Sequence, residues 1–255
     1  MSLKRTLAAL LTSLALLVPL SACTVQISDD EHADASSSIS TGRTDGSTAS
    51  DMADWDSDEA PNYYLVTGKA NFSAAGSMPS TGTIRYASPD SLNRSGTAVG
   101  VIDHRMMKSG SARERHMPET ITGWPKHNPK VAIRMASGRT YHGYLFNKSH
   151  LIAKSLGGED SARNMVTGTR TQNVGDNDAT PGGMAYTETL ARDWLKTHPN
   201  GTIDYMAAPH YSGSELLPRT VSVDIRSSDR SIDQHVIVYN TAEGYDIDYM
   251  NGGTR

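Results

Sequence analysis

One stretch in the middle of the chain, residues 144–188, carries most of the information on fold and chemistry, and it reads YLFNKSHLIAKSLGGEDSARNMVTGTRTQNVGDNDATPGGMAYTE. The aromatic-rich run Thr140–Phe146 at its start predicts a strand, Ser149–Ser155 predicts the start of a short helix, and Gly157-Gly158 breaks the chain. His150 lies at the predicted junction of strand and helix, and polar amides follow it at Asn164, Gln172, Asn173 and Asn177. On these residues alone the role of His150 stays open, because a single histidine is more often structural than catalytic.

The flanking sequence predicts an α+β domain over 61–255 with a mixed or antiparallel central sheet. Tyr186–Thr197 has helical spacing, with Leu190, Ala191, Trp194 and Leu195 on one face. Short strands with Ser, Asp, Gly or Asn between them are predicted on both sides of this helix, at Tyr63–Val66, Thr83–Tyr86, Asn164–Thr167, Ile203–Met206, Thr220–Ile225, His235–Tyr239 and Tyr245–Tyr249. We therefore expect a strand-rich domain with a helical segment in its middle.

The first 23 residues are typical of a secretory signal, because Lys4 and Arg5 precede an apolar run over 7–20 that ends in small residues. The end of this run, Leu20-Ser21-Ala22-Cys23, resembles the lipobox of bacterial lipoproteins, in which the cysteine becomes the first mature residue and carries lipid. The resemblance predicts that lipid on Cys23 anchors the protein to the extracellular side of the bacterial cytoplasmic membrane. A secreted protein is the alternative for its location, and a buried structural cysteine is the alternative for Cys23.

Residues 24–60 predict an acidic, disordered tether. The segment contains ten acids and one base, is rich in Ser, Thr and Gly, and has few apolar side chains with which to form a core. The whole chain has a net charge of −4, of which the tether contributes −9 and the first 23 residues contribute +2. The domain over 61–255 therefore carries +3, which permits a polyanionic partner. An acidic binding motif is the alternative interpretation of the tether.

Composition and motifs exclude several classes of protein. The chain has one cysteine and therefore no internal disulfide, and only its N-terminal run approaches the length of a membrane span. The sequence contains no G-x-x-x-x-G-K-[ST], H-E-x-x-H, C-x-x-C or G-x-S-x-G motif. This excludes P-loop, zincin and thiolate-zinc sites and the serine-hydrolase elbow. Any catalysis must therefore come from the 144–188 stretch.

Several strings in the chain belong to one recognisable pattern. The most specific lies between 147 and 174 and contains Asn147-Lys148-Ser149-His150-Leu151-Ile152, Gly157-Gly158, Asn164 and Thr167-Gly168-Thr169-Arg170-Thr171-Gln172-Asn173-Val174. Others are Asn93–Ala98, Thr122–Trp124, Gly182–Glu188, Pro218–Val223 and Val238–Asn240. Together they resemble the DNA/RNA non-specific endonuclease family of the ββα-metal nuclease superfamily, in its branch of streptodornases and DNA-entry nucleases. The resemblance covers roughly residues 61–250 and implies a ββα-metal nuclease core.

The resemblance implies roles for individual residues. It assigns His150 as the general base that takes a proton from water, a role that a neutral imidazole suits near pH 7. It assigns Asn173 as the ligand of a divalent cation, Mg²⁺ with Mn²⁺ as a substitute, although an asparagine more often caps a turn. Glu188 matches a glutamate that orients the waters around the metal, and Asn164 matches an asparagine that supports the site. On residues alone, Glu188 pairs equally well with Arg192 along a helix, and Asn164 closes a turn.

The sequence departs from the family pattern at one place. The family often has Asp-Arg-Gly before the histidine, whereas this chain has Asn147-Lys148-Ser149. Any role that the family's Asp and Arg side chains perform is therefore in doubt here.

The family attacks DNA, and often RNA, without base preference, so the resemblance implies DNA as a partner, RNA as a second substrate and no obligate protein partner. Arg170 and Arg94 are candidate phosphate-binding residues by charge alone, although a solvated surface position is the commoner use of an arginine. Two other classes of function stay open. One is a lipoprotein that binds nucleic acid or a wall polymer without cleaving it, and the other is a solute-binding lipoprotein, for which we expect a larger, two-lobed chain.

Overall fold

A computed structural model of the protein describes residues 49–52, 54–176 and 180–255. The predicted signal segment with Cys23, and the predicted tether as far as residue 48, lie outside the described residues. In the part that is described, no helix is both long and apolar enough to cross a membrane.

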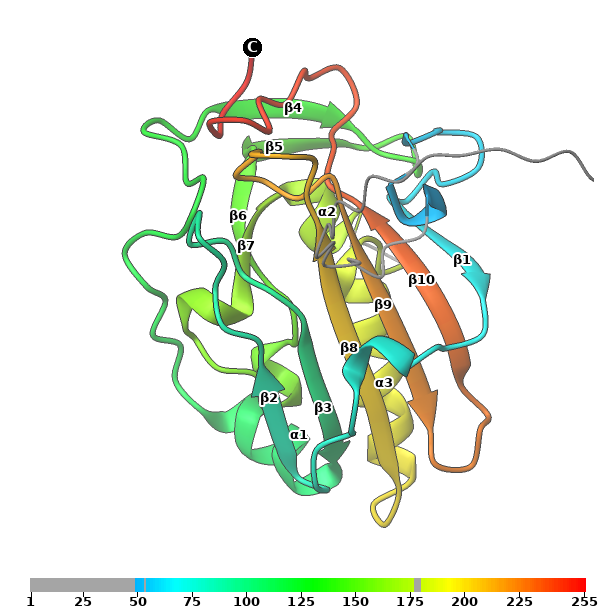
Figure 1. The fold of residues 1–255 in the computed structure, drawn as a ribbon. Coiled ribbons are helices and arrows are strands. Elements are labelled where there is room, and N and C mark those ends of the chain that lie inside the picture. The colour runs from blue at the N-terminus through cyan, green and yellow to red at the C-terminus, as the bar shows by residue number, and fades with distance from the viewer. Residues whose placement is uncertain (1–48, 53, 177–179) are drawn as a thin grey trace, which may run out of the picture. The chain divides into compact units, whose positions relative to one another are not determined.

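A six-stranded antiparallel sheet forms the centre of the domain, with the strand order β1-β10-β9-β8-β3-β2 (Figure 1). Its strands are β1 (Tyr64–Gly68), β2 (Thr83–Tyr86), β3 (Ala98–Asp103), β8 (Thr202–His210), β9 (Thr220–Ser227) and β10 (Asp233–Tyr239). Two ribbons of two strands each complete the β structure, namely β4 (Lys130–Arg134) with β5 (Thr140–Tyr144) and β6 (Phe146–His150) with β7 (Met165–Thr169). The predicted α+β class and antiparallel central sheet are confirmed.

The main hydrophobic core lies between one face of this sheet and the helices α1 (His104–Ala112) and α3 (Met184–Thr197), with α3 behind the sheet in Figure 1. Side chains of β9 alternate, so that Val221 and Val223 enter the core while Ser222 and Asp224 lie on the opposite face. The buried stripe of α3 includes Leu195, and burial of such a side chain contributes about 1.5–3 kcal/mol. The chain that follows β6 also packs into this core, through Leu151, Ile152 and Leu156, and is thereby held in place.

The remaining helical elements are short. They are α2 (Arg170–Val174) and the 3₁₀ turns η1 (Ala49–Met52), η2 (Ser73–Ala75), η3 (Lys154–Leu156) and η4 (Ala162–Asn164). Two predictions of local structure are wrong. At the predicted helix start Ser149–Ser155, the first two residues instead end β6, because the ladder with β7 extends through His150 opposite Met165. The 3₁₀ turn η3 begins later, at Lys154. The strand at Tyr245–Tyr249 is instead a series of turns with two isolated bridges.

The last residues of the predicted tether are part of the folded domain, so the boundary at residue 60 must move toward the N-terminus. Asp51 is buried, with its carboxylate 3.4 Å from Nε2 of His235. The Trp55 ring stacks on Tyr63 at 4.8 Å, and Ala60 is 1% exposed. Composition alone missed this because a few specific contacts, rather than a run of apolar residues, hold the segment on the sheet.

Candidate active site

The candidate site is built on the two strands β6 and β7 and the helix α2 that follows them. The β6–β7 ladder places His150 at the end of β6, opposite Met165. Thr169 ends β7 and caps α2, because its hydroxyl accepts a hydrogen bond from the backbone N–H of Gln172 at 3.0 Å. Asn240 fixes the same junction, since its Oδ1 accepts from the backbone N–H of Thr169 at 2.8 Å. This is the strand–strand–helix core that the family resemblance implied.

Asn173 lies on α2 with its amide oxygen facing β6, where the hydroxyl of Ser149 donates to Oδ1 at 3.2 Å. The next side chain, Gln172, is fully buried, and neither of its amide atoms has a hydrogen-bond partner within the described ranges. No group of three or more His, Cys, Asp or Glu side chains suited to a metal forms among the described residues. Amide oxygens without such a cage fit a hard cation such as Mg²⁺, which keeps several waters and needs few protein ligands.

His150 is 9% exposed and is held by a carboxylate. Its Nε2 lies 2.8 Å from Oδ1 of Asp160, whose Oδ2 accepts from the backbone N–H of His116 at 2.8 Å. Burial lowers the pKa of His150 below its ordinary value of 6.5; Asp160 opposes this change, while Arg115 and Arg113 add to it. The imidazole is therefore neutral at pH 7 and able to accept a proton.

A glycine-containing loop carries Asp160 back to the histidine. A Cβ atom at Gly158 would lie 1.8 Å from the backbone oxygen of Ile152, so only glycine fits there. Asn164 is fully buried and ties the loop together, because its Oδ1 accepts from the N–H of Ile152 at 3.0 Å. Its Nδ2 donates to the carbonyl oxygens of Ile152 and Glu159, both at 2.9 Å. Asn164 therefore supports the loop that holds His150.

Glu188 lies one turn into α3. Burial raises the pKa of Glu188 to about 7, and the charges of Arg192 and Arg115 act in the opposite direction. Arg115 also acts on His150, so the two residues lie within electrostatic range of the same guanidinium group. Arg192 itself donates hydrogen bonds to the hydroxyl groups of Ser155 and Thr189.

The two predicted phosphate-binding arginines both make contacts inside the domain. Arg94 lies over the ring of Tyr211 at 4.5 Å and donates to Asp90 at 2.6 Å and to two backbone carbonyls. Arg170 lies over the ring of Tyr141 at 4.8 Å and donates to one backbone carbonyl. These bonds occupy donors that a phosphate would need, and a role for either residue in substrate binding stays a prediction.

Two residues near His150 escaped the sequence analysis, namely Asp160 and Arg115. Asp160 is an acid in the loop between the candidate histidine and Asn164, and that position is the signal that would have found it. Arg115 is an exposed residue of the segment after α1, and no pattern in the sequence marks it.

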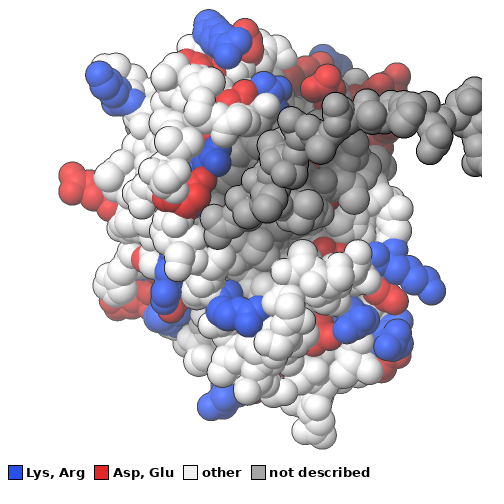
Figure 2. Space-filling view, viewed as in Figure 1, with Lys and Arg blue, Asp and Glu red and all other residues white. Residues whose placement is uncertain are grey.

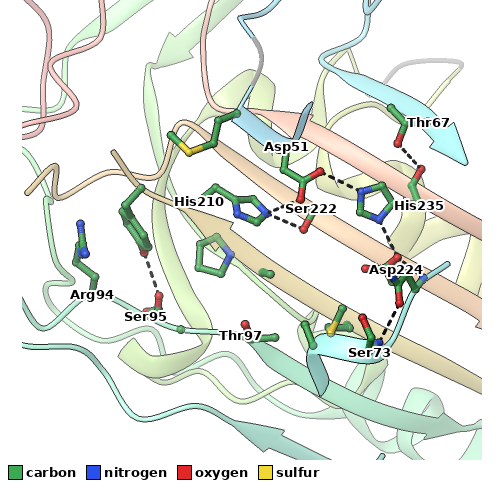
Figure 3. A pocket seen from close by; sticks show the side chains of 18 of the residues that line it. Asp51, Thr67, Ser73, Arg94, Ser95, Thr97, His210, Ser222, Asp224 and His235 are labelled. Atoms are coloured by element: carbon green, nitrogen blue, oxygen red, sulfur yellow. Dashed lines mark hydrogen bonds and ion pairs between the residues drawn. The ribbon is translucent and has the colours of Figure 1, made fainter. Parts of the chain in front are cut away.

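A cavity of about 910 Å³ lies on the opposite face of the sheet (Figure 3). Of the predicted site residues it is lined only by Arg94. Its walls carry paired side chains, with His235 Nδ1 2.8 Å from Asp224 and His210 Nε2 2.7 Å from Ser222. Because His235 also contacts Asp51 of η1, this network holds the N-terminal turn on the sheet. These side chains thus have a structural role, and we assign the chemistry to the β6–β7–α2 site.

We predict that Glu188→Gln stabilises the metal-free protein at pH 8. Because the folded-state pKa of Glu188, about 7, lies above its ordinary value of 4.5, the folded state binds the proton more tightly than the unfolded state. The free energy of unfolding of the wild type therefore falls as the pH rises from about 4.5 to 7, and the variant lacks this loss. The two proteins should differ little at pH 4 and by about 3 kcal/mol at pH 8.

Urea unfolding at both pH values, with EDTA present throughout, measures this difference. Glu114→Gln is the control, because its side chain is 90% exposed, and it should leave the pH dependence unchanged. Equal pH dependence of the wild type and Glu188→Gln would contradict the prediction.

Comparison with known proteins agrees with this geometry. The family model described as DNA/RNA non-specific endonuclease matches residues 78–229. A deoxyribonuclease of Streptococcus dysgalactiae subsp. equisimilis is 42% identical over 127 residues, which are 50% of this chain and 38% of that protein. The chain thus matches well under half the length of that relative.

Solved structures with the same fold include Sda1 nuclease with a bound zinc ion, which is 36% identical. That match covers 79% of this chain and 99% of Sda1, with a TM-score of 0.74. NucA from Streptococcus agalactiae with a magnesium ion bound is 23% identical over 70% of this chain and 79% of its own, with a TM-score of 0.54, and shows the fold alone. The sequence match and the Sda1 likeness establish that the chain belongs to the DNA/RNA non-specific endonuclease family.

Proposed function

We propose that the protein is a metal-dependent endonuclease that hydrolyses phosphodiester bonds of DNA, with RNA as a second substrate, without sequence specificity. The observation that supports this most directly is the β6–β7–α2 site, where a neutral His150 and the amide oxygen of Asn173 lie on adjoining elements. The names of two relatives, a deoxyribonuclease and a nuclease with bound zinc, support the substrate class and the need for a metal.

The side chains of the site suit in-line hydrolysis. His150 accepts a proton from water through Nδ1, and the water oxygen bonds to phosphorus. The bond from phosphorus to the 3′ oxygen breaks, and that oxygen takes up a proton from solvent water. A divalent cation, Mg²⁺ in our proposal, supplies Lewis-acid stabilisation of the phosphoryl oxygens when bound. Asn173 would hold this cation through Oδ1, with its amide oriented by Ser149. Glu188 would orient the waters of this cation through its ionised carboxylate, which favours activity above about pH 7.

The charge distribution supports binding without sequence preference. Residues 61–255 carry +3, and the five acids of residues 49–60, which fold with them, bring the domain to −2. Figure 2 shows Lys and Arg interspersed with Asp and Glu on the face of the sheet away from α3. Contacts to backbone phosphates carry no sequence information and weaken as salt rises. We therefore expect cleavage that tolerates any base sequence and declines with ionic strength.

The location of the protein is a separate part of the proposal. We propose that it is exported and anchored by lipid on Cys23 to the extracellular side of the cytoplasmic membrane, on the evidence of the N-terminal sequence. Labelling with a radioactive fatty acid tests this, because Cys23→Ala should abolish the label and release the protein into the medium. Label retained in that variant would contradict the proposal.

Cleavage assays test the activity. The full-length protein is incubated with plasmid DNA, single-stranded DNA and RNA in Mg²⁺, in Mn²⁺ and in EDTA. The proposal predicts nicking, then linearisation and short fragments with either metal, and no cleavage in EDTA. Retardation of DNA in a gel, without cleavage under any condition, would instead support the alternative of a non-catalytic binding lipoprotein.

A further inference from the structure

We propose that Asp160 is a positioning residue for His150, which keeps the imidazole proton on Nε2 and so leaves Nδ1 as the atom that accepts a proton from water. The inference rests on the proposed function, because it takes His150 as the general base.

The contact is short and shielded from water. Nε2 of His150 lies 2.8 Å from Oδ1 of Asp160, and the two side chains are only 10% and 6% exposed. The second oxygen of Asp160 is also bonded, since Oδ2 accepts from the backbone N–H of His116 at 2.8 Å. Arg113 braces the same loop by donating to the carbonyl of Gly158 at 2.6 Å, with its guanidinium 3.9 Å from Asp160. Both carboxylate oxygens are therefore fixed by the surrounding chain.

An ionised carboxylate dictates the tautomer of its partner. Although burial opposes ionisation, hydrogen bonds from the backbone of His116 and from His150 keep the pKa of Asp160 below its ordinary value. A carboxylate can only accept hydrogen bonds, so Nε2 of a neutral His150 must carry the proton and donate it. Nδ1 is then an acceptor, and no hydrogen bond in the described part of the chain occupies it.

The neighbouring side chains that carry charge do not hold the imidazole of His150. Lys148, two positions before the histidine, donates to the carbonyls of Pro118 and Glu119 and lies over the ring of Trp124. Among the described residues, Asp160 is the only acid that forms an ion pair with His150. The orientation of the imidazole therefore depends on one side chain.

Asp160→Asn separates this role from packing, because the shape of the side chain is kept. Its single remaining oxygen can serve either His116 or His150, but not both. The backbone N–H of His116 can only donate, so it retains the oxygen. The new NH₂ group then faces Nε2, which must accept, and the imidazole proton moves to Nδ1. That tautomer has no free acceptor for the proton of water.

Kinetics on the full-length protein give the first test. We expect Asp160→Asn to lower kcat for plasmid cleavage on the order of 10- to 100-fold with little change in KM, as is typical when the partner that orients a functional histidine is lost. Asp229→Asn is the matched control, because Asp229 also lies near a histidine, His198, but on the surface. It should leave kcat unchanged.

Two further readouts distinguish positioning from a merely structural effect. In ¹⁵N-histidine NMR spectra recorded in EDTA, His150 should be the Nε2–H tautomer in the wild type and shift toward Nδ1–H in Asp160→Asn. In a His150→Gly background rescued by free imidazole, Asp160→Asn should cause no further loss, because the added base is not held by Asp160.

The outcomes separate this inference from the proposed function. An unchanged tautomer with kcat within twofold of wild type, or a full loss that persists in the imidazole-rescued background, would overturn the role of Asp160. Full activity in His150→Gly without imidazole would overturn the general base itself. The tautomer measurement does not depend on activity, so it tests the Asp160–His150 contact in either case.

Discussion

His150→Ala should lower kcat/KM for plasmid cleavage by about 10²- to 10⁴-fold, the range expected when a general base is removed. The residue sits at the end of a paired strand, is neutral at pH 7 and has Nδ1 directed away from its bond to Asp160. Water is a poor base at neutral pH and does not replace the imidazole. The initial rate of loss of supercoiled plasmid, at saturating Mg²⁺ and pH 7.5, measures the effect.

His142→Ala is the matched control for this variant. His142 lies exposed on β5, in the ribbon that precedes β6, so its replacement should change neither activity nor stability. The melting temperature of His150→Ala should show that the variant is folded. A folded His150→Ala protein that cleaves at the wild-type rate would remove His150 from the mechanism.

Local patterns predicted those elements in which apolar and polar residue types alternate regularly between two faces. β2 was predicted at its observed bounds, and the buried stripe of α3 follows from helical spacing of Ala191, Trp194 and Leu195. β9 alternates with a period of two because one of its faces meets α3. In each of these elements, contact with the core recurs at a regular spacing. The apolar residues therefore recur at the same spacing in the sequence.

Elements that depend on distant partners escaped prediction. α1 contains Gly110, although glycine is a poor helix former. The position requires glycine because a Cβ atom there would lie 2.3 Å from the backbone oxygen of Lys154. β3 contains Gly100, where a Cβ atom would lie 3.0 Å from Ile84. Glycine in a sequence predicts neither a helix nor a strand. In α1 and in β3, however, close packing against a neighbouring segment favours glycine.

The candidate site was predicted in part, and for different reasons at each residue. His150 and Asn173 were singled out by their resemblance to a family, since no periodicity distinguishes a catalytic from a structural polar residue. Asp160 was missed because its role exists only after the loop from Gly157 to Asn164 folds back onto β6. A contact across such a loop leaves no regular spacing in the sequence.

Asn173→Ala should reduce cleavage at saturating Mg²⁺ by about 10²- to 10³-fold and raise the Mg²⁺ concentration that gives half-maximal rate. Asn173 supplies the protein oxygen proposed to hold the cation, and the Lewis-acid contribution of such a cation is worth several kcal/mol. Asn173→Asp keeps an oxygen at this position and adds charge, so it should lower the half-maximal Mg²⁺ concentration relative to Asn173→Ala. Rates measured across a Mg²⁺ titration give both quantities.

Ser149→Ala and Asn251→Ala bracket the expected effect. Ser149→Ala removes only the hydroxyl that orients the amide of Asn173, so its loss of activity should be smaller. Asn251→Ala changes an exposed asparagine that bonds Asp248, and should have no effect. If Asn173→Ala loses activity without any change in its Mg²⁺ dependence, the residue acts on the fold of α2 rather than on the metal. If Asn173 is a metal ligand, the Mg²⁺ concentration for half-maximal rate should rise in the order Asn251→Ala, Ser149→Ala, Asn173→Ala.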